Sequence, residues 1–325
     1  MRPAVSSSRD LALGIDLGGT KILAGVVDGR HRVLGRGKLK TPFRGTAAKL
    51  TGALVEAADL ALKEAGVPRE RIAAVGVAAP GPVDADKGIL LFAANIDIKG
   101  WDVGKALGTA FPKARRRLEN DVRLAAFGEA HLGAGRGVPV LAAFWVGTGI
   151  GGAVVVDGRL WKGKNRNAGE FGHVQIDFRR AKPGKIDGTL EGIGAKVGMA
   201  RWLRKKVAQG EKSLLGKTVS KDGARLRGSE MKAAVDAGDP LALRAVARSA
   251  KSVGMAMANV FNILAPDRFV LGGGVATDLG ERYLVNVRKW AEAFCFTTEL
   301  GGIEIVPAAL GDDAGLLGAA LYARE

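Results

Sequence analysis

Cysteine is nearly absent from this 325-residue sequence, in which Cys295 is the only one. A single thiol excludes an internal disulfide framework and any metal site built from several cysteines, and it suits a reducing compartment. Aromatic residues are also scarce, at 6%, and no zinc-finger, RRM or KH signature accompanies them. No apolar run approaches 18 residues, and the polar residues 1–10 lack the apolar core of a signal peptide. We therefore expect a soluble, cytoplasmic protein without a membrane or nucleic-acid partner.

The composition that remains is that of a globular protein with more than one core. Apolar residues make up 47% of the chain and charged residues 25%, and 325 residues exceed the size at which a single core stops growing. The net charge of +16 is uneven, because residues 179–232 contain 15 Lys and Arg against five Asp and Glu. A solvated basic face is the plain interpretation of this basic segment, and a binding site for a polyanion is the alternative.

Strand-like and helix-like patterns alternate along the chain. The predicted strands span residues 11–16, 22–27, 30–40, 72–79, 138–146, 153–156, 267–271 and 303–307, with a short one ending at 118–121. The predicted helices span residues 47–65, 103–109, 122–132, 195–207, 222–232, 240–264, 283–294 and 313–324. Residues 84–101 between them are predicted as a loop. This repeated alternation predicts an α/β fold.

The first glycine-rich stretch, LALGIDLGGTKILAGVVD at residues 11–28, predicts a β-hairpin. Two apolar runs flank the tight reversal Gly18-Gly19-Thr20, with Asp16 before the turn and Lys21 after it. Backbone N–H groups, a hydroxyl and an ammonium group suit phosphate oxygens, and a carboxylate at the strand end can position a hydrated Mg²⁺. An ordinary hairpin with a polar tip is the alternative.

A second stretch of the same plan, WVGTGIGGAVVVDG, contains Gly147, Gly149 and Gly152 in the spacing G-x-G-x-x-G. In a dinucleotide-binding fold these glycines open a helix, but here an apolar strand pattern follows them. The context therefore disfavours NAD and favours a glycine hairpin whose amides face phosphate. Two hairpins of one plan suggest an internal duplication with a nucleotide between the halves.

The pair Asn120-Asp121 stands where a predicted strand meets a predicted helix. Both residue types are good helix N-caps, so a structural cap is one interpretation. The other is a carboxylate presented for catalysis, because such junctions carry functional groups in α/β folds.

The stretch GEKSLLGKT at 210–218 resembles a Walker A loop, but its first glycine is one position too far upstream and no strong strand precedes it.

Five motifs stand in order along the chain. They are Asp16-Leu-Gly-Gly-Thr-Lys21, Leu118-Glu-Asn-Asp121, Gly147-Thr-Gly-Ile-Gly-Gly152, Glu170-Phe-Gly-His173 and Leu271-Gly-Gly-Gly-Val275. With them the sequence resembles the ROK family of bacterial sugar kinases and related repressors, from about Leu11 to Ala323. The resemblance implies the two-domain α/β actin-like ATPase (ribonuclease H-like) fold, with residues 11–121 and 308–325 in a small domain and 122–307 in a large one. Repressor members carry an N-terminal helix-turn-helix extension, for which ten residues leave no room, so a stand-alone kinase is expected.

The resemblance also implies a role for each matching residue. Asp121 would be the general base, and Asp16 would order Mg²⁺ through water. The residues that would bind sugar hydroxyls are Asn95, Asn120, Asp121, Glu170, His173 and Glu191. The residues that would hold ATP are Asp16, Gly18, Gly19, Thr20, Lys21, Gly147, Thr148, Gly149, Gly151, Gly273 and Gly274. Without the family match, Glu170 would be interpreted as a residue that stabilises a turn, and His173 as a structural histidine.

One departure from the family pattern concerns zinc. Many members bind zinc through a histidine and a C-x-C-G-x-x-G-C-x-E segment, but here the corresponding stretch is PGKIDGTLE at 183–191, without cysteine. Because thiolates would close such a site, zinc is not expected, and His173 keeps only its sugar role.

The expected reaction is ATP-dependent phosphorylation of a hexose at the 6-hydroxyl, with glucose as the expected substrate. Polyphosphate as the donor, another sugar (N-acetylmannosamine, fructose or allose) and a non-catalytic sugar sensor are the alternatives. Family resemblance also suggests a homodimer.

Overall fold

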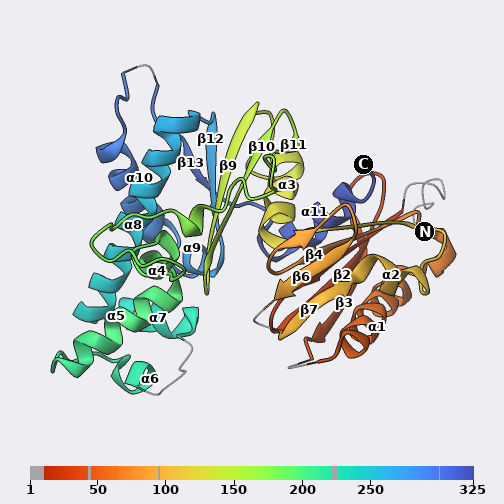
Figure 1. The fold of residues 1–325 in the computed structure, drawn as a ribbon, viewed down its shortest axis with the longest axis horizontal. Helices are drawn as coiled ribbons and strands as arrows, with labels where there is room; N and C mark the ends of the chain where they lie inside the picture. The colour runs from red at the N-terminus through yellow and green to blue at the C-terminus, as the bar shows by residue number, and fades with distance from the viewer. Residues whose placement is uncertain (1–10, 43–44, 94–95, 221–225, 300) are drawn as a thin grey trace. The chain divides into compact units, whose positions relative to one another are not determined.

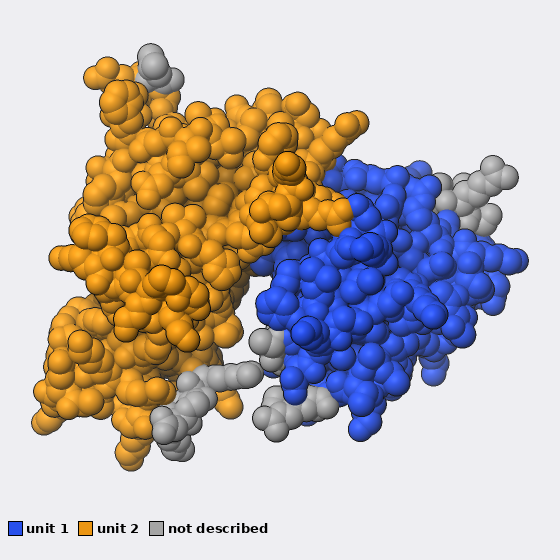
Figure 2. Space-filling view, in the orientation of Figure 1, with its two compact units in different colours: residues 1–133, 310–325 blue, residues 134–309 orange. Residues whose placement is uncertain are grey.

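The computed structural model describes residues 11–42, 45–93, 96–220, 226–299 and 301–325, and the chain divides into two compact units, coloured separately in Figure 2. Unit 1 comprises residues 1–133 and 310–325, and unit 2 comprises residues 134–309. The predicted ranges placed the boundaries at 121/122 and 307/308 instead. The difference is mainly helix α3 (Asp121–Leu132), which packs along the C-terminal helix α11 (Ala314–Tyr322) and so stays in unit 1.

Unit 1 is built on a five-stranded mixed sheet of order β3-β2-β1-β4-β8. The strands are β1 (Ala12–Leu17), β2 (Lys21–Val27), β3 (Val33–Lys40), β4 (Ala74–Ala79) and β8 (Arg115–Asn120). The first three form an antiparallel meander, as the first hairpin predicted, while β4 and β8 run parallel to β1. Because β1 and β4 are covered on both faces, nearly all their residues are buried, which explains their unbroken apolar pattern.

Helices cover both faces of this sheet (Figure 1). Helix α1 (Ala47–Ala65) packs on β2 and β3, while α11 packs on β1, β2 and β4 on the other face. Thr46 caps α1 through its side chain and Gly66 ends it in the left-handed conformation, at the bounds that the sequence predicted. The short elements of the unit are α2 (Val103–Gly108) and the 3₁₀ turns Arg69–Arg71 and Gly311–Asp313.

Gly76 and Gly52 in unit 1 should respond oppositely to replacement by alanine. A Cβ on Gly76 would lie 1.9 Å from the carbonyl oxygen of Ala319, so Gly76→Ala forces α11 off the sheet and should cost roughly 1–3 kcal/mol. A Cβ on Gly52, exposed within α1, meets nothing within 4 Å, so Gly52→Ala should gain about 0.5–1 kcal/mol of helix stability. Urea unfolding midpoints measure both changes. A Gly76→Ala midpoint equal to wild type would contradict this close packing.

Unit 2 repeats the sheet plan of unit 1. Its strands are β9 (Val140–Val146), β10 (Ile150–Val156), β11 (Arg159–Leu160), β12 (Arg268–Gly272) and β13 (Ile305–Pro307). Their order is β11-β10-β9-β12-β13, again an antiparallel meander followed by two strands parallel to its first strand. The second predicted hairpin is confirmed, and the shared strand order supports the internal duplication inferred from the two hairpins.

The helices of unit 2 lie largely between β11 and β13 in the chain. They are α4 (Leu190–Gly194), α5 (Lys196–Ala208), α6 (Gly216–Ser220), α7 (Gly228–Asp236), α8 (Pro240–Leu264), α9 (Gly274–Leu279) and α10 (Glu281–Phe294), with a 3₁₀ turn at Phe171–His173. Asp239 caps α8 by accepting from two backbone N–H groups, and Pro240 takes its first position. The buried face of α8 packs on α10 and on the helices α4 and α5.

The predicted loop at 84–101 is wrong, because this stretch contributes to a three-stranded antiparallel sheet of β5 (Val83–Asp84), β6 (Ile89–Ala93) and β7 (Ile98–Asp102). Leu91 and Phe92 of β6 are exposed, so the strand lacks the apolar-polar alternation that marks a half-buried strand.

None of the described helices is both long and apolar enough to cross a membrane.

Candidate active site

The first hairpin brings a carboxylate and an ammonium group to the end of β1. Its turn is closed by the N–H of Gly18, which donates to the carbonyl of Lys21 at 2.9 Å. Thr41, the residue after strand β3, holds the turn, since its hydroxyl donates to the carbonyl of Gly18 at 2.7 Å and its N–H to that of Thr20 at 3.1 Å. Thr20 is exposed at the tip. The loop is therefore fixed in shape while its tip faces solvent.

Asp16, the penultimate residue of β1, sits in a negatively charged environment. A Cβ on Gly315, at the start of α11, would lie 3.0 Å from its carboxyl carbon. Burial, together with the negative charges of Asp121 and Asp312, raises the pKa of Asp16 to about 7, although the charge of Lys21 opposes the rise. Lys21 also pairs with Asp312, with 2.5 Å between Nζ and Oδ2. This end of unit 1 therefore concentrates carboxylates around one cation.

Asp121 follows the last residue of β8 and begins helix α3. Asn120 is the cap, since its Oδ1 accepts from the N–H of Arg123 at 3.1 Å and its amide donates to the carbonyl of Gly81 at 3.2 Å. Asp121 Oδ1 accepts from the N–H of Val122 at 2.8 Å. Because β1, β4 and β8 are parallel, their carboxyl ends meet at one edge, which carries Asp16 and Asp121 together.

Two buried side chains, neither of which was among the predicted site residues, fix the junction before Asp121. Glu119 is fully buried, its Oε1 accepts from the N–H of Asn120 at 3.0 Å, and it pairs with buried Arg123 at 3.4 Å. Removing either charge would leave the other buried, so the pair constrains the backbone that presents Asp121. Their i, i+4 spacing across a strand-to-helix junction is the only signal the sequence offers.

The second hairpin loop in unit 2 is bound to a helix and to Glu191. Its turn closes through Gly147 N–H to Gly149 carbonyl at 2.8 Å, and Lys196 N–H at the start of α5 donates to the Gly147 carbonyl at 3.0 Å. Glu191 Oε2 accepts from the N–H of Ile150 at 2.9 Å, and a Cβ on Gly149 would lie 2.3 Å from the same oxygen. A side chain at position 149 would therefore displace this carboxylate from its present place.

The loop residues of this hairpin have different surroundings. Thr148 is exposed at the tip, whereas Gly151 lies within β10 and pairs with Trp145 of β9. Gly151 is therefore placed in the strand beside the loop, and Gly147, Thr148 and Gly149 form the loop itself.

The segment that carries Glu170 and His173 packs against β10. A Cβ on Gly172 would lie 1.9 Å from the carbonyl oxygen of Ile150, so the segment approaches that strand closely. The N–H of Leu190 donates to the carbonyl of Val174 at 2.9 Å, which ties the segment to the start of α4. Glu191 thus contacts Ile150 at its N–H, and the turn that contains Glu170 and His173 approaches Ile150 at its carbonyl. His173 is exposed.

The glycine turn after β12 lies against the second hairpin. Gly273 has φ +87°, and a Cβ there would lie 2.6 Å from the carbonyl oxygen of Val146. A Cβ on Gly274 would lie 3.8 Å from the ammonium group of Lys196. Lys196 could not be predicted from the sequence, because nothing local distinguishes it from the other basic residues of its segment.

A cavity of about 300 Å³ lies beside this glycine turn. Its lining residues are Leu271, Ala276, Thr277, Gly280, Glu281, Leu284, Pro307 and Ala308. Its volume and largely apolar wall, with one hydroxyl and one carboxylate, suit a small flat ligand. The sequence predicted the glycines but not the cavity, whose walls come from four separate elements.

The predicted site residues thus form two sets, one in each unit. Unit 1 carries Asp16, the first hairpin loop, Asn120 and Asp121, while unit 2 carries the second hairpin loop, Glu170, His173, Glu191 and the Gly273–Gly274 turn. Asn95 lies outside the described residues. Within the described ranges, no three His, Cys, Asp or Glu side chains gather closely enough to hold a metal ion.

Comparisons with known proteins identify the family of this chain. A model of the ROK family matches residues 12–325. A glucokinase of Halalkalibacterium halodurans is 30% identical over 318 residues, which cover 96% of this chain and 94% of the relative. An N-acetyl-D-glucosamine kinase of Salmonella typhimurium is 29% identical over 327 residues, covering 94% and 97%.

Two solved structures share the whole fold. The ROK hexokinase from Thermus thermophilus is 34% identical with a TM-score of 0.78, covering 97% of this chain and 98% of that one. The ROK family glucokinase from Streptomyces griseus, solved with glucose and AMPPNP, is 31% identical with a TM-score of 0.80, covering 97% and 99%.

Proposed function

The chain belongs to the ROK family and is a sugar kinase, and we propose that it transfers the γ-phosphoryl group of ATP to the 6-hydroxyl of glucose. The named activities of the glucokinase relatives support this choice of sugar, and the AMPPNP and glucose bound to the Streptomyces griseus enzyme support both substrates. The observation that carries the proposal is the edge of unit 1, where Asp121 lies at the carboxyl end of β8 and Asp16 at that of β1.

In this mechanism Asp121 accepts the proton of the attacking sugar hydroxyl as the sugar oxygen bonds to the γ-phosphorus, while the bond from that phosphorus to the bridging oxygen breaks and ADP leaves. Phosphoryl transfer needs a positioned nucleophile and neutralised phosphate charge more than covalent help from the protein. Asp121 can position a hydroxyl because Asn120 takes over the capping of α3 and the Glu119–Arg123 pair fixes the backbone. Its own bond to the Val122 N–H fixes one carboxylate oxygen.

The remaining polar residues would bind the two substrates. Asn120, Glu170, His173 and Glu191 would hydrogen-bond sugar hydroxyls, which all need partners when the sugar is enclosed. The hairpin loops at 18–20 and 147–149, with Lys21, would hold the donor phosphates, and Gly151 stands at the edge of the second loop. Gly273, Gly274 and the adjoining cavity of about 300 Å³ would hold the adenosine.

Magnesium fits the unit 1 site through Asp16. Its carboxyl group is desolvated and faces further negative charge, a situation that a divalent cation relieves. Since the described residues offer no complete ligand set, the remaining ligands would be donor phosphates and water, which is how Mg²⁺ is commonly bound. When bound with ATP, the ion would neutralise phosphate charge, while Asp16 holds it in place.

Lys196→Met should raise the KM for ATP by roughly 10- to 100-fold, because a charge-assisted bond to a phosphate is worth about 1.5–3 kcal/mol. The KM for the sugar should change far less, since Lys196 lies at the Gly274 turn. Steady-state kinetics with each substrate varied in turn separate the two constants. The matched control is Lys289→Met, an exposed lysine on α10. Equal effects of both variants on the KM for ATP would contradict a phosphate contact.

Other substrates define the alternatives to ATP and glucose. The N-acetyl-D-glucosamine kinase among the relatives makes that sugar a competitor, alongside N-acetylmannosamine, fructose and allose. Inorganic polyphosphate is the alternative donor, given the net charge of +16. A non-catalytic sugar sensor would bind sugar without turnover. The need for ATP supports a cytoplasmic location, and membership of the family supports a homodimer.

A panel of sugars and donors assayed on the purified protein tests the proposal. Glucose with ATP should give the highest kcat/KM, and activity with polyphosphate, if present, should fall steeply between 50 and 200 mM salt because polyanion binding releases counterions. A higher kcat/KM for another sugar would reassign the substrate. Sugar binding without turnover for every pair would favour the sensor.

A further inference from the structure

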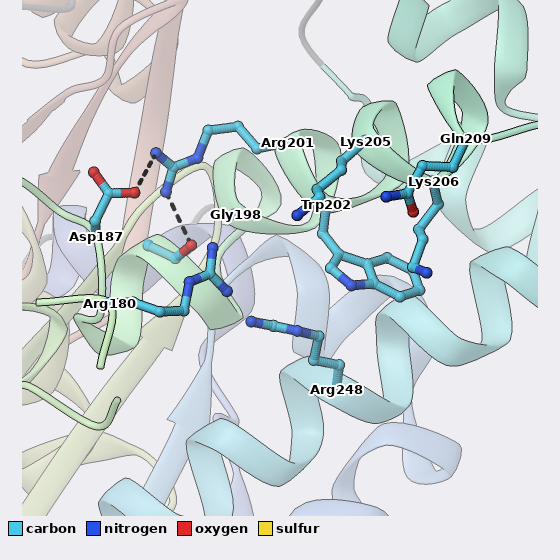
Figure 3. Close-up of a pocket in the computed structure, with 10 residues that line it drawn as sticks. Arg180, Asp187, Gly198, Arg201, Trp202, Lys205, Lys206, Gln209 and Arg248 are labelled. Carbon is cyan, nitrogen blue, oxygen red and sulfur yellow. Dashed lines mark hydrogen bonds and ion pairs between the residues drawn. The ribbon is translucent and has the colours of Figure 1, made fainter. Parts of the chain in front are cut away.

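A second cavity in unit 2, of about 570 Å³, is lined mostly by basic side chains (Figure 3). Helix α5 supplies Arg201, Lys205 and Lys206, helix α8 supplies Arg248, and the segment before α4 supplies Arg180. Asp187 is the only carboxylate among the described lining residues, and Trp202 contributes an aromatic wall. The volume lies in the range of small-molecule sites. The basic segment predicted as a solvated face thus contributes four of its cations to one concavity.

Two of the five cations already pair with carboxylates. Arg201 pairs with Asp187 at 3.4 Å, and its other terminal nitrogen donates to the carbonyl of Gly192 at 3.0 Å. Lys206 pairs with Glu211 at 3.0 Å. These contacts hold the two side chains in place without filling the cavity.

The other three cations, Arg180, Lys205 and Arg248, have no hydrogen bond or ion pair from their side chains within the described ranges. Figure 3 shows the guanidinium groups of Arg180 and Arg248 pointing toward one another across the cavity. Burial lowers the pKa of Arg248, the charge of Arg180 lowers it further, and Asp177 only partly offsets them. Like charges that converge in a half-buried concavity destabilise one another unless an anion lies between them.

We propose that this cavity binds a small ligand that carries two or more phosphate groups. One phosphate group carries about −1.5 to −2 charges near pH 7, so two of them match three unneutralised cations. Arginine forks bind phosphate oxygens in pairs, and Arg180 and Arg248 approach from opposite sides. Trp202 gives an organic ligand an apolar surface, although Arg244 already lies 5.4 Å from its ring centroid. The ligand can thus be an inorganic oligophosphate or an organic bisphosphate.

The site is distinct from the proposed donor site in unit 2. The donor phosphates are assigned to the loop at 147–149 and to Lys196, none of which lines this cavity. The two sites are connected through α4, because Gly192 lines the cavity and the preceding Glu191 accepts from the N–H of Ile150. They are also connected through α5, whose first residue, Lys196, donates to the carbonyl of Gly147 and whose later residues line the cavity. Binding here therefore need not involve turnover.

Titration calorimetry on the full chain tests the proposal, with AMPPNP and glucose present at saturation and again absent. Inorganic tripolyphosphate should bind at one site per chain, more tightly than pyrophosphate and much more tightly than inorganic phosphate. Its affinity should fall steeply between 50 and 200 mM salt. Fructose 1,6-bisphosphate is the probe for an organic ligand. If it binds more tightly than pyrophosphate, the ligand is an organic bisphosphate. If it binds more weakly, the ligand is an inorganic oligophosphate.

Variants locate the binding. Arg180→Gln with Arg248→Gln should weaken tripolyphosphate binding by about a hundredfold, since each of the two lost charge-assisted bonds is worth about a factor of ten. The matched control, Arg136→Gln with Arg159→Gln, removes the same charge from exposed positions of unit 2 outside the cavity and should change affinity less than threefold. Lys205→Gln, at an exposed side chain, provides a second test if the double variant does not fold.

Three results would overturn the proposal. They are the absence of tripolyphosphate binding, its loss when AMPPNP saturates the protein, and equal weakening by the cavity variant and the control. The second result would assign the oligophosphate to the donor site. Since calorimetry needs no turnover, an inactive preparation would contradict the proposed kinase reaction without affecting this outcome.

Discussion

Asp121→Asn should lower kcat by roughly 10²- to 10⁴-fold with both substrates still bound. The amide keeps the shape of the side chain and can still meet a hydroxyl, but it cannot accept the proton of the attacking sugar. Asn120 provides the cap of α3 and the Glu119–Arg123 pair holds the junction, so neither depends on the charge of Asp121. Steady-state kinetics give kcat, and calorimetry with glucose gives the affinity.

Asp102→Asn is the matched control for this substitution. Asp102 also ends a strand of unit 1 and caps the following helix, since its Oδ1 accepts from the N–H of Lys105 at 2.7 Å. Asparagine caps a helix as well as aspartate does, so this variant should keep both fold and turnover. A kcat for Asp121→Asn within a few-fold of wild type would remove Asp121 from the role of base.

Asp16→Asn should lower turnover by roughly 10²-fold or more, because it removes a charge that balances the cations at the donor phosphates. The same variant should stabilise the protein without ligands near neutral pH. Burial and the charge of Asp121 raise the pKa of Asp16 to about 7, so the folded protein holds a proton there that the unfolded chain loses near pH 4. Asparagine imitates the protonated form and avoids the cost of ionising it.

The sign of this effect follows from proton linkage. A carboxyl whose pKa is raised on folding contributes stability that is fully present below pH 4 and is lost as pH rises to about 7. The advantage of Asp16→Asn should therefore be near zero at pH 4, grow through pH 7 and stay constant above it, reaching on the order of a few kcal/mol. Urea midpoints from pH 4 to 8 measure it, with Asp102→Asn as control. If the difference in urea midpoint between Asp16→Asn and wild type did not change with pH, this would contradict a raised pKa of Asp16.

Most of the fold could be predicted from local patterns in the sequence. The two glycine hairpins, the capped helix α1 and the proline-led helix α8 are all set by residues close together in the sequence. Strand β6 was missed because its apolar side chains do not alternate, and two of them face solvent. The unit boundary after residue 133 also escaped prediction, because α3 and α11 join through long-range packing that leaves only small residues as a signal.

The candidate site could likewise be predicted only where the signal lies in neighbouring residues of the sequence. Asp16 and Asp121 could be found because each ends a predicted strand, and parallel strands bring such ends to one edge. Glu191 was found by family resemblance alone, and its bond to the N–H of Ile150 joins positions 41 residues apart. Lys196 and the basic cavity depend on helix packing, so in the sequence their cations are indistinguishable from a solvated face. Counting charges in the sequence identifies the basic segment 179–232, but only the folded structure shows where its cations come together.

Phosphorus NMR of the reaction between ATP and glucose tests the central claim most directly. The spectrum should show glucose 6-phosphate and ADP forming in equal amounts, and Asp121→Asn at the same concentration should form both roughly 10²-fold more slowly or slower still. Formation of ADP and inorganic phosphate without a sugar phosphate, or of a sugar phosphorylated at another position, would contradict the proposed transfer to the 6-hydroxyl.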